Sequence, residues 1–315
     1  MLSSRAAAIR GIVLILVASV CFGVSGSLAK PLINAGLTPL QVTWIRVAGM
    51  AVVMILLALP VLRRVSGAPL AGLLGFGLTA IAGVQACYFL AVDRLPVGIA
   101  LLLEFTGPIL VVAWIRWVRR AKLPRAAVAG ALLSLAGLAF VVEVWTGIRL
   151  DALGLLFGAG AAACQATYFL VGEELTAKAD LRILLAVGFG VGAVALTPFA
   201  APWSMDWAVL GQTATLGGAE LSGAVIAAAL ILSTMFAYLL GLPAIVLLSA
   251  PVAGGLAYAE VVVAAVAAWL LLGETLTAPQ IVGGLIVVAG VFTAQRAVTA
   301  RPAPSPEPAE AARPT

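Results

Sequence analysis

Charged side chains are rare in this sequence, and a few of them stand inside long apolar runs. Glu104 lies in LLLEFTGPIL (101–110), Arg46 lies in an earlier apolar stretch, and Glu260 lies in a later one. A charged group inside a bilayer is costly and usually faces a bundle interior or a wet cavity. These three residues are therefore the leading candidates for a binding or translocation site. Glu143 is set aside, because it lies near a predicted membrane surface where water solvates it.

The turn that carries Glu104 has a second unusual feature. Pro108 follows four residues later and cannot donate the hydrogen bond that the carbonyl of Glu104 would accept in a regular helix. Thr106 and Gly107 loosen the same turn. The turn thus offers a carboxylate and a free carbonyl to a cationic or hydrogen-bonding ligand, and Gly107 and Pro108 are predicted to form a hinge.

Uncharged polar residues accompany these charges in the apolar segments. They are Gln85, Tyr88, Gln165, Tyr168, Tyr258, Ser25 and Ser27. A few convergent polar groups in an apolar pocket are typical of a small-molecule site. Two interpretations stay open: each of these groups can serve a hydrogen bond between helices, and Arg46 and Glu104 can simply neutralise each other.

The composition places the chain in a membrane. Of its 315 residues, 63% are hydrophobic and 10% are charged, with a mean hydropathy of +1.17, whereas soluble domains are about 25% charged. The chain has no histidine, and its three cysteines stand apart without a CxxC spacing. We therefore expect no metal, no cofactor and no enzymatic activity.

Ten apolar segments are long enough to cross a bilayer, which takes about 20 residues. They cover residues 9–30, 39–62, 70–91, 97–117, 126–145, 152–173, 182–200, 222–241, 249–272 and 279–297. The boundary between segments 222–241 and 249–272 is placed at Pro243 and Pro251, because proline often ends a helix.

The distribution of basic residues supports this division. With both termini in the cytoplasm, the inner segments hold Arg5, Arg10, Arg63, Arg64, Arg116, Arg119, Arg120, Lys122, Arg125, Lys178, Arg182, Arg296, Arg301 and Arg313, and the outer ones hold Lys30, Arg94 and Arg149. This asymmetry is the positive-inside pattern. The net charge of +5 is thereby explained by topology, and no nucleic-acid partner is expected.

The two halves of the chain resemble each other. GALLSLAGLAF (130–140) matches GGLIVVAGVF (283–292) at an offset of 153, and Cys21 matches Cys164 at an offset of 143. Since each half holds five helices, the second half enters the membrane inverted, as in secondary transporters. We predict an all-α membrane protein of ten helices in two inverted repeats, residues 1–148 and 149–300, with a disordered cytoplasmic tail at 301–315.

Three stretches resemble the drug/metabolite transporter superfamily, in particular its EamA-type members with ten helices. They are SLAK (27–30), YFLAVDRLPVGIALLLEFTGPIL (88–110) and LLGETLTAPQIVGGL (271–285). The second is most similar to the inner-membrane threonine and homoserine exporter group, as is the position of Arg46. The first half has no counterpart of the Gly-Glu-Thr-Leu run, since the basic run 116–125 lies there instead.

The resemblance implies a secondary carrier in a bacterial inner membrane that exports a small polar metabolite, such as threonine or homoserine. Glu104, with Glu260 as second choice, would attract a substrate ammonium or carry a proton, and Arg46 would pair with Glu104 or receive a carboxylate. The alternatives are a carrier of drugs, nucleobases or lipid intermediates and, more remotely, a lipid-modifying enzyme. The sequence does not fix the oligomeric state.

Overall fold

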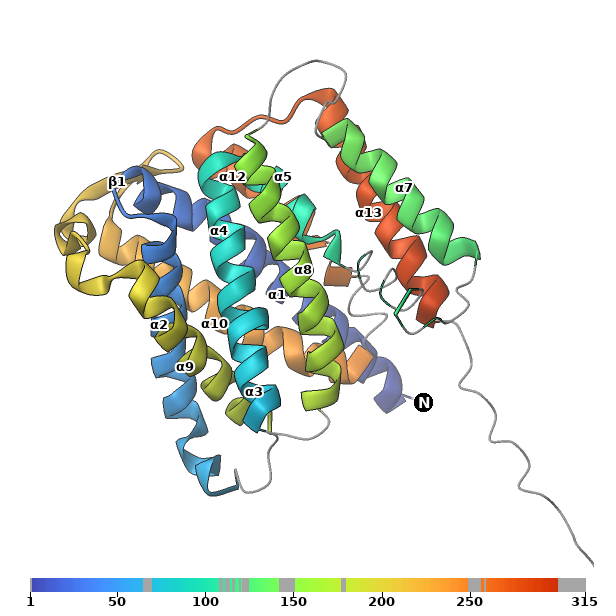
Figure 1. The fold of residues 1–315 in the computed structure, drawn as a ribbon, viewed down its shortest axis with the longest axis horizontal. Helices are drawn as coiled ribbons and strands as arrows, with labels where there is room; N and C mark the ends of the chain where they lie inside the picture. The colour runs from blue at the N-terminus through green and yellow to red at the C-terminus, as the bar shows by residue number, and fades with distance from the viewer. Residues whose placement is uncertain are drawn as a thin grey trace, which may run out of the picture.

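The computed structural model describes residues 2–64, 70–107, 125–141, 151–176, 180–248 and 259–299, with isolated positions between these ranges. The predicted tail at 301–315 lies outside the described residues. All ten predicted segments contain described helix, and the first half supplies five of them (Figure 1). They are α1 (Leu2–Asn34), α2 (Pro39–Ala58), a third segment made of α3 (Leu70–Phe76), η2 (Gly77–Gly83) and α4 (Val84–Arg94), α5 (Val97–Glu104), and α7 (Arg125–Val141).

The second half supplies five more helices. They are α8 (Ala152–Thr176), α9 (Leu181–Ala200), α10 (Gly223–Leu248), α12 (Ala259–Leu272) and α13 (Ala278–Thr299). Short 3-10 helices occur at η1 (Leu59–Arg64), η3 (Pro202–Ser204) and η4 (Trp207–Gly211), and a β-hairpin is formed by β1 (Thr213–Leu216) and β2 (Ala219–Ser222). The helical fold is the one predicted, with a small hairpin added in a connection.

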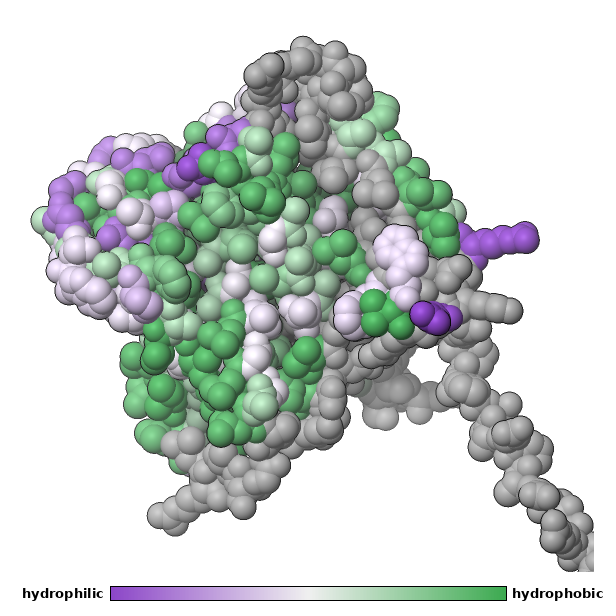
Figure 2. Space-filling view, in the orientation of Figure 1, coloured by the Kyte–Doolittle hydropathy of each residue, from purple (hydrophilic) through white to green (hydrophobic). Residues whose placement is uncertain are grey.

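The outside of the bundle is apolar. Val194, Phe199 and Leu285 are 74%, 71% and 63% exposed, although large apolar side chains in contact with water are unfavourable. Figure 2 shows hydrophobic residues over the flanks and hydrophilic ones gathered around the hairpin. Five of the described helical segments are long and apolar enough to span a bilayer, and shorter apolar helices accompany them. The flanks are therefore the surface that lipid covers.

The helices pack as two inverted repeats should. Helix α1 packs on α10 and α12, while its equivalent in the second half, α8, packs on α4 and α5. Helix α2 packs on its own equivalent α9, and α7 packs on its equivalent α13, beside which it lies in Figure 1. One hydrogen bond joins residues that the offset of 153 makes equivalent: Ser134 Oγ donates to the carbonyl of Val287 at 3.2 Å. Such a pair lies close to the axis that relates the repeats. Trp44 Nε1 also joins α2 to α9, by donating to Thr197 Oγ1 at 2.9 Å.

Glycines bring α7 and α13 into close contact. A Cβ added at Gly137 would lie 2.8 Å from the carbonyl oxygen of Gly283, and one added at Gly290 would lie 2.6 Å from that of Gly130. These are the four glycines that the repeat aligns in pairs. Small residues at a helix crossing let backbones approach closely, which stabilises packing in a membrane.

This contact gives a first prediction. We expect Gly290→Leu to lower membrane abundance and the melting temperature of the purified protein, since overpacking costs about 1–3 kcal/mol. Gly190→Leu is the matched control, because a Cβ at Gly190 meets no atom within 4 Å. Fluorescence-detected size-exclusion chromatography of heated samples measures both, and equal behaviour of the two variants would contradict the close contact.

Two features of the helices differ from the sequence prediction. Helix α10 continues through Pro243 to Leu248 instead of ending at 241, because a proline is tolerated inside a membrane helix when neighbours satisfy the freed backbone groups. The third segment is interrupted by a π-helix at Gly77–Gly83. Such irregular turns often accompany functional sites, and this one directly precedes Gln85.

The β-hairpin identifies one end of the bundle, called here the hairpin end. Gly217 and Gly218 form its turn with φ of 60° and 82°, a backbone that glycine adopts without strain. The amide of Gly217 donates to the carbonyl of Leu271 at 3.0 Å, which ties the hairpin to the end of α12. The turn between α4 and α5 lies at this same end, because the N–H of Val97 donates to Glu274, just after α12, at 2.9 Å. The start of α8 joins this turn through an ion pair between Arg94 and Asp151 at 3.3 Å.

Candidate functional site

Arg46 is the largest fully buried side chain described, with 2% of its surface exposed. It is held by two elements of opposite repeats. Its Nε donates to Thr234 Oγ1 on α10 at 2.7 Å, and its guanidinium lies over the ring of Phe89 on α4 at 5.2 Å. Thr234 in turn donates to the carbonyl of Leu230 at 2.8 Å. A cation is thus fixed in the bundle interior by a hydroxyl and an aromatic face.

Glu104 lies at the point where α5 ends. The next residues form a tighter turn, in which Thr106 N donates to the carbonyl of Leu103 at 3.0 Å and its Oγ1 donates to the same carbonyl at 2.6 Å. The carboxylate is 9% exposed and accepts a hydrogen bond from Gln165 Nε2 on α8 at 3.1 Å. The predicted helix 97–117 is therefore broken directly after its carboxylate. Discontinuous helices of this kind form the binding sites of many carriers.

Gly107 allows α8 to approach this turn. A Cβ at Gly107 would lie 2.8 Å from Gln165 Oε1 and 2.9 Å from the carbonyl of Ala162. The structure thus places the predicted hinge glycine against the amide that binds Glu104. Its partner in that prediction, Pro108, lies outside the described residues, and the hinge stays a prediction.

The three charged candidates lie near enough to act on one another electrostatically. Arg46 interacts electrostatically with both Glu104 and Glu260, and the two carboxylates also interact with each other. No direct ion pair joins Arg46 to Glu104, although both side chains are described. The direct pair considered from the sequence is absent, because Arg46 turns its Nε to Thr234 while Glu104 binds Gln165.

The polar candidates surround these charges. Tyr88 and Gln85 on α4 are buried, and the hydroxyl of Tyr88 lies against Gly26 of α1. Tyr88 and Tyr238 both interact electrostatically with Arg46. Tyr258 and the side chain of Tyr168 lie outside what the structure describes.

Sequence reasoning missed Thr234, Phe89 and Tyr238. Tyr238 stacks edge-on against Phe22 and Phe189, with ring centroids 5.1 and 5.2 Å apart. The sequence could have indicated Tyr238, because it aligns with the polar candidate Gln85 at the repeat offset of 153. Thr234 and Phe89 carried no such signal, because a threonine and a phenylalanine in a membrane helix are ordinary.

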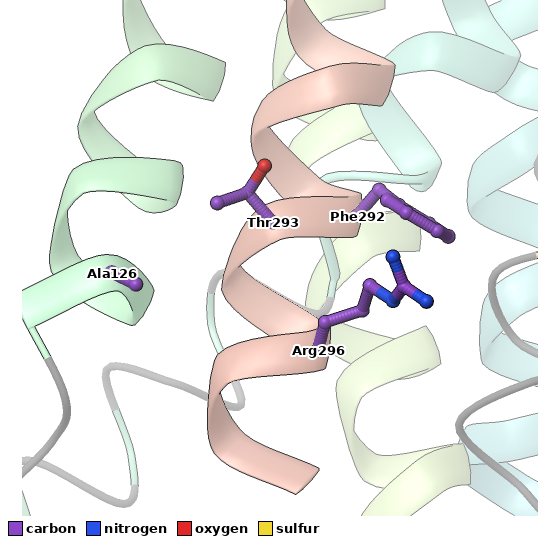
Figure 3. A pocket seen from close by; sticks show the side chains of 4 residues that line it. All are labelled: Ala126, Phe292, Thr293 and Arg296. Atoms are coloured by element: carbon purple, nitrogen blue, oxygen red, sulfur yellow. The ribbon is translucent and has the colours of Figure 1, made fainter. Parts of the chain in front are cut away.

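The centre of the site is closed in this structure. Arg46, Gln85 and Glu104 are each less than 10% exposed, and Gln165 and Glu260 are half-buried. A surface pocket of about 570 Å³ lies at the hairpin end and is lined by Lys30, Asn34, Gln212 and Glu274 among others. Another, of about 430 Å³, is lined by Ala126 of α7 and by Phe292, Thr293 and Arg296 of α13, where Arg296 extends beside Phe292 (Figure 3).

The described residues contain no group of three or more histidine, cysteine or acidic side chains that could hold a metal ion. The chemistry of the site is that of a buried cation, two carboxylates and hydrogen-bonding amides and hydroxyls. Groups of this kind can pair with charged groups of a small molecule and exchange hydrogen bonds with it.

Ten apolar segments in inverted repeats, with a closed polar site between them, define a multi-pass membrane transporter. The chain belongs to the EamA-like transporter family, whose model matches residues 9–143 and 152–294, once in each half. It is therefore a transporter and not an enzyme.

Individual relatives agree with this assignment. The threonine/homoserine exporter RhtA of Escherichia coli (strain K12) is 30% identical over 293 residues, which cover 89% of this chain and 90% of that protein. RhtA of Salmonella typhimurium (strain SL1344) is 29% identical over 290 residues, covering 88% of each chain. A crystal structure titled only as that of a protein shares the fold, with a TM-score of 0.61 and 18% identity over 91% of this chain and 97% of the other.

Proposed function

We propose that this protein exports small polar metabolites, in particular amino acids such as threonine and homoserine, across the bacterial inner membrane. The observation that carries the proposal is the closed site in which Arg46 lies among Glu104 and Glu260, between elements of both repeats. An α-amino acid carries one ammonium and one carboxylate, so the two kinds of charge in the site match it. The names of the relatives at 29–30% identity point to the same substrates.

Each charge has a role in this proposal. Glu104 attracts the substrate ammonium, with Glu260 as a second carboxylate, and Arg46 receives the substrate carboxylate. The hydrogen bond described for Arg46 uses Nε, which leaves the two terminal amino groups of the guanidinium for bidentate binding of a carboxylate. Gln165, Gln85 and Tyr88 supply hydrogen bonds around the substrate.

The proposal includes an orientation and a source of energy. Both termini face the cytoplasm, because the basic residues then follow the positive-inside pattern, and the hairpin end faces outward. Repeats at 1–148 and 149–300 move against each other around the site. Glu104 is the candidate group for proton coupling, since a carboxylate in an apolar cavity is easily neutralised.

Transport by the purified full-length protein tests the proposal. In proteoliposomes loaded with radiolabelled threonine, we expect release at least about tenfold faster than from protein-free liposomes, and competition by unlabelled homoserine. A nucleobase and a lipophilic cation are run in parallel as the rival substrate classes. Transport of either of these without transport of any amino acid would contradict the proposed substrate class.

A further inference from the structure

Lys30, at the end of α1, joins three separate segments at the hairpin end. Its Nζ donates to the carbonyls of Val92 and Leu95 at 2.8 and 3.3 Å and forms an ion pair with Glu274 at 3.4 Å. Glu274 accepts a hydrogen bond from the backbone N–H of Val97, the first residue of α5, at 2.9 Å. This cluster, called here the Lys30–Glu274 gate, connects α1 and the α4–α5 turn of the first repeat with the α12–α13 link of the second.

The gate lies between solvent and the interior. On its outer side is the pocket of about 570 Å³, which both side chains help to line; each of the two side chains is about one-fifth exposed, at 19% and 20%. A pocket of this size is in the range that small ligands occupy. A substrate leaving at the hairpin end would therefore meet these two charges last.

On the inner side of the gate, one face of α1 leads to Glu260, which is half-buried. Gly23, Gly26, Ser27 and Lys30 share this face by helical spacing, and Gly23 is about 10 Å from Lys30 along the axis. A Cβ at Gly23 would lie 2.9 Å from the carbonyl of Glu260, and one at Gly26 would collide with Tyr88 and Val97. The face thus carries little side-chain volume of its own between Lys30 and Glu260, and in this closed state Val263, Tyr88 and Val97 of neighbouring helices pack against it.

A polar group without a partner lies on this face. Ser27 is 0% exposed, and its hydroxyl makes no hydrogen bond in the structure. A buried hydroxyl without a hydrogen bond is unfavourable by about 1–3 kcal/mol. Its position one turn below Lys30 suits contact with a polar molecule that moves along α1.

We propose that Lys30 and Glu274 form the outer gate of the carrier, and that a zwitterionic substrate opens the gate by replacing their ion pair. The proposal rests on the proposed function for its substrate class. Separating Lys30 from Glu274 leaves two partly buried charges without a partner of opposite charge, which is unfavourable. An α-amino acid removes this penalty, because its carboxylate pairs with Lys30 and its ammonium pairs with Glu274. A molecule with only one charge leaves one gate residue unpaired.

Accessibility of Ser27 from outside tests the gate without requiring transport. Ser27→Cys is made in a full-length chain whose three native cysteines are replaced by alanine, and a membrane-impermeant thiol reagent is applied to right-side-out and inside-out vesicles. Asn34→Cys, at the exposed end of α1, reports the orientation and the access of the reagent. We expect Lys30→Met and Glu274→Gln each to accelerate labelling of Ser27→Cys from outside about tenfold, equivalent to about 1.4 kcal/mol in favour of the open form.

The matched control is Arg94→Met, which breaks another ion pair at the same end. The Arg94 and Asp151 side chains are 37% and 40% exposed, and exposed pairs contribute little to stability. Labelling should stay unchanged in this variant. An unchanged rate in both gate variants, or equal acceleration in Arg94→Met, would overturn the gate.

A second experiment tests whether the substrate must carry both charges. It uses the Ser27→Cys chain with Lys30 and Glu274 unchanged. Threonine added outside should accelerate labelling of Ser27→Cys, whereas threoninamide and N-acetylthreonine, with one charge each, should not. If these analogues accelerated labelling as much as threonine does, the substrate would not open the gate by replacing the ion pair. The same conclusion would follow if no amino acid that the proteoliposomes transport accelerated labelling. If proteoliposomes transport no amino acid, the proposed substrate class fails, while the two gate variants still decide whether the gate exists.

Discussion

Glu104→Gln is expected to reach the membrane at near-normal abundance and to lose most of its transport. The amide keeps the shape and the oxygen that accept the hydrogen bond from Gln165, so the local packing survives. It can neither pair with an ammonium nor take up a proton. Since a hydrogen bond to a charged group contributes about 1.5–3 kcal/mol, transport should fall about ten- to hundredfold.

Abundance by fluorescence-detected chromatography and efflux from proteoliposomes separate this outcome from misfolding. Glu220→Gln is the control, because that carboxylate is exposed on β2 and the substitution should change neither quantity. In the double variant Glu104→Gln/Arg46→Gln, transport should stay lost. An active double variant at normal abundance would show that Glu104 only neutralises charge.

The second large effect is expected from Arg46→Gln. Glu104 and Glu260 would then face each other without Arg46, which is the cation near both of them among the described residues. Two like charges in a low-dielectric interior repel strongly, and the bonds to Thr234 and Phe89 are lost as well. We expect membrane abundance to fall several-fold, because leaving buried charge uncompensated costs about 3–5 kcal/mol, and transport to disappear.

A compensating substitution distinguishes this cause from a simple loss of packing. Arg46→Gln/Glu260→Gln removes one carboxylate together with the cation, so abundance should recover while transport stays absent. Thr234→Val serves as the matched control, since it removes the hydrogen-bond partner of Arg46 but leaves every charge in place; its abundance should fall less than that of Arg46→Gln. Normal abundance of Arg46→Gln alone would contradict the electrostatic role.

Much of the architecture was predictable from the sequence, because in a bilayer apolar length and the placement of basic residues determine the segments. The repeat offset was informative too: glycines paired by it, such as Gly137 and Gly290, lie in the contact between α7 and α13. The boundaries were less predictable. Pro243 was expected to end a helix that in fact continues to Leu248, since tertiary neighbours decide whether a membrane helix passes a proline.

The site was predictable in its charges but not in its partners. Glu104, Arg46 and Glu260 were selected because ionisable groups in apolar segments are conspicuous, and the structure brings them together. The bonds of Arg46 to Thr234 and of Glu104 to Gln165 depend on how α10 and α8 pack. Which side chains meet across a helix bundle depends on how the helices are placed against one another, and the residue types alone do not determine that placement.

The Lys30–Glu274 gate has no equivalent in the other repeat. At an offset of 153 the counterpart of Glu274 is Ala121, and at an offset of 143 the counterpart of Lys30 is Glu173. Two perfectly symmetric halves would give inward-facing and outward-facing states of equal energy. The proposed gate at one end breaks this degeneracy. In the proposed orientation it favours states whose outer end is closed, so the empty carrier exposes its site to the cytoplasm more often than to the outside. Such a bias leaves the final substrate gradient across the membrane unchanged. It lowers the apparent affinity of the carrier for substrate on the outside, so exported substrate is taken up again only slowly.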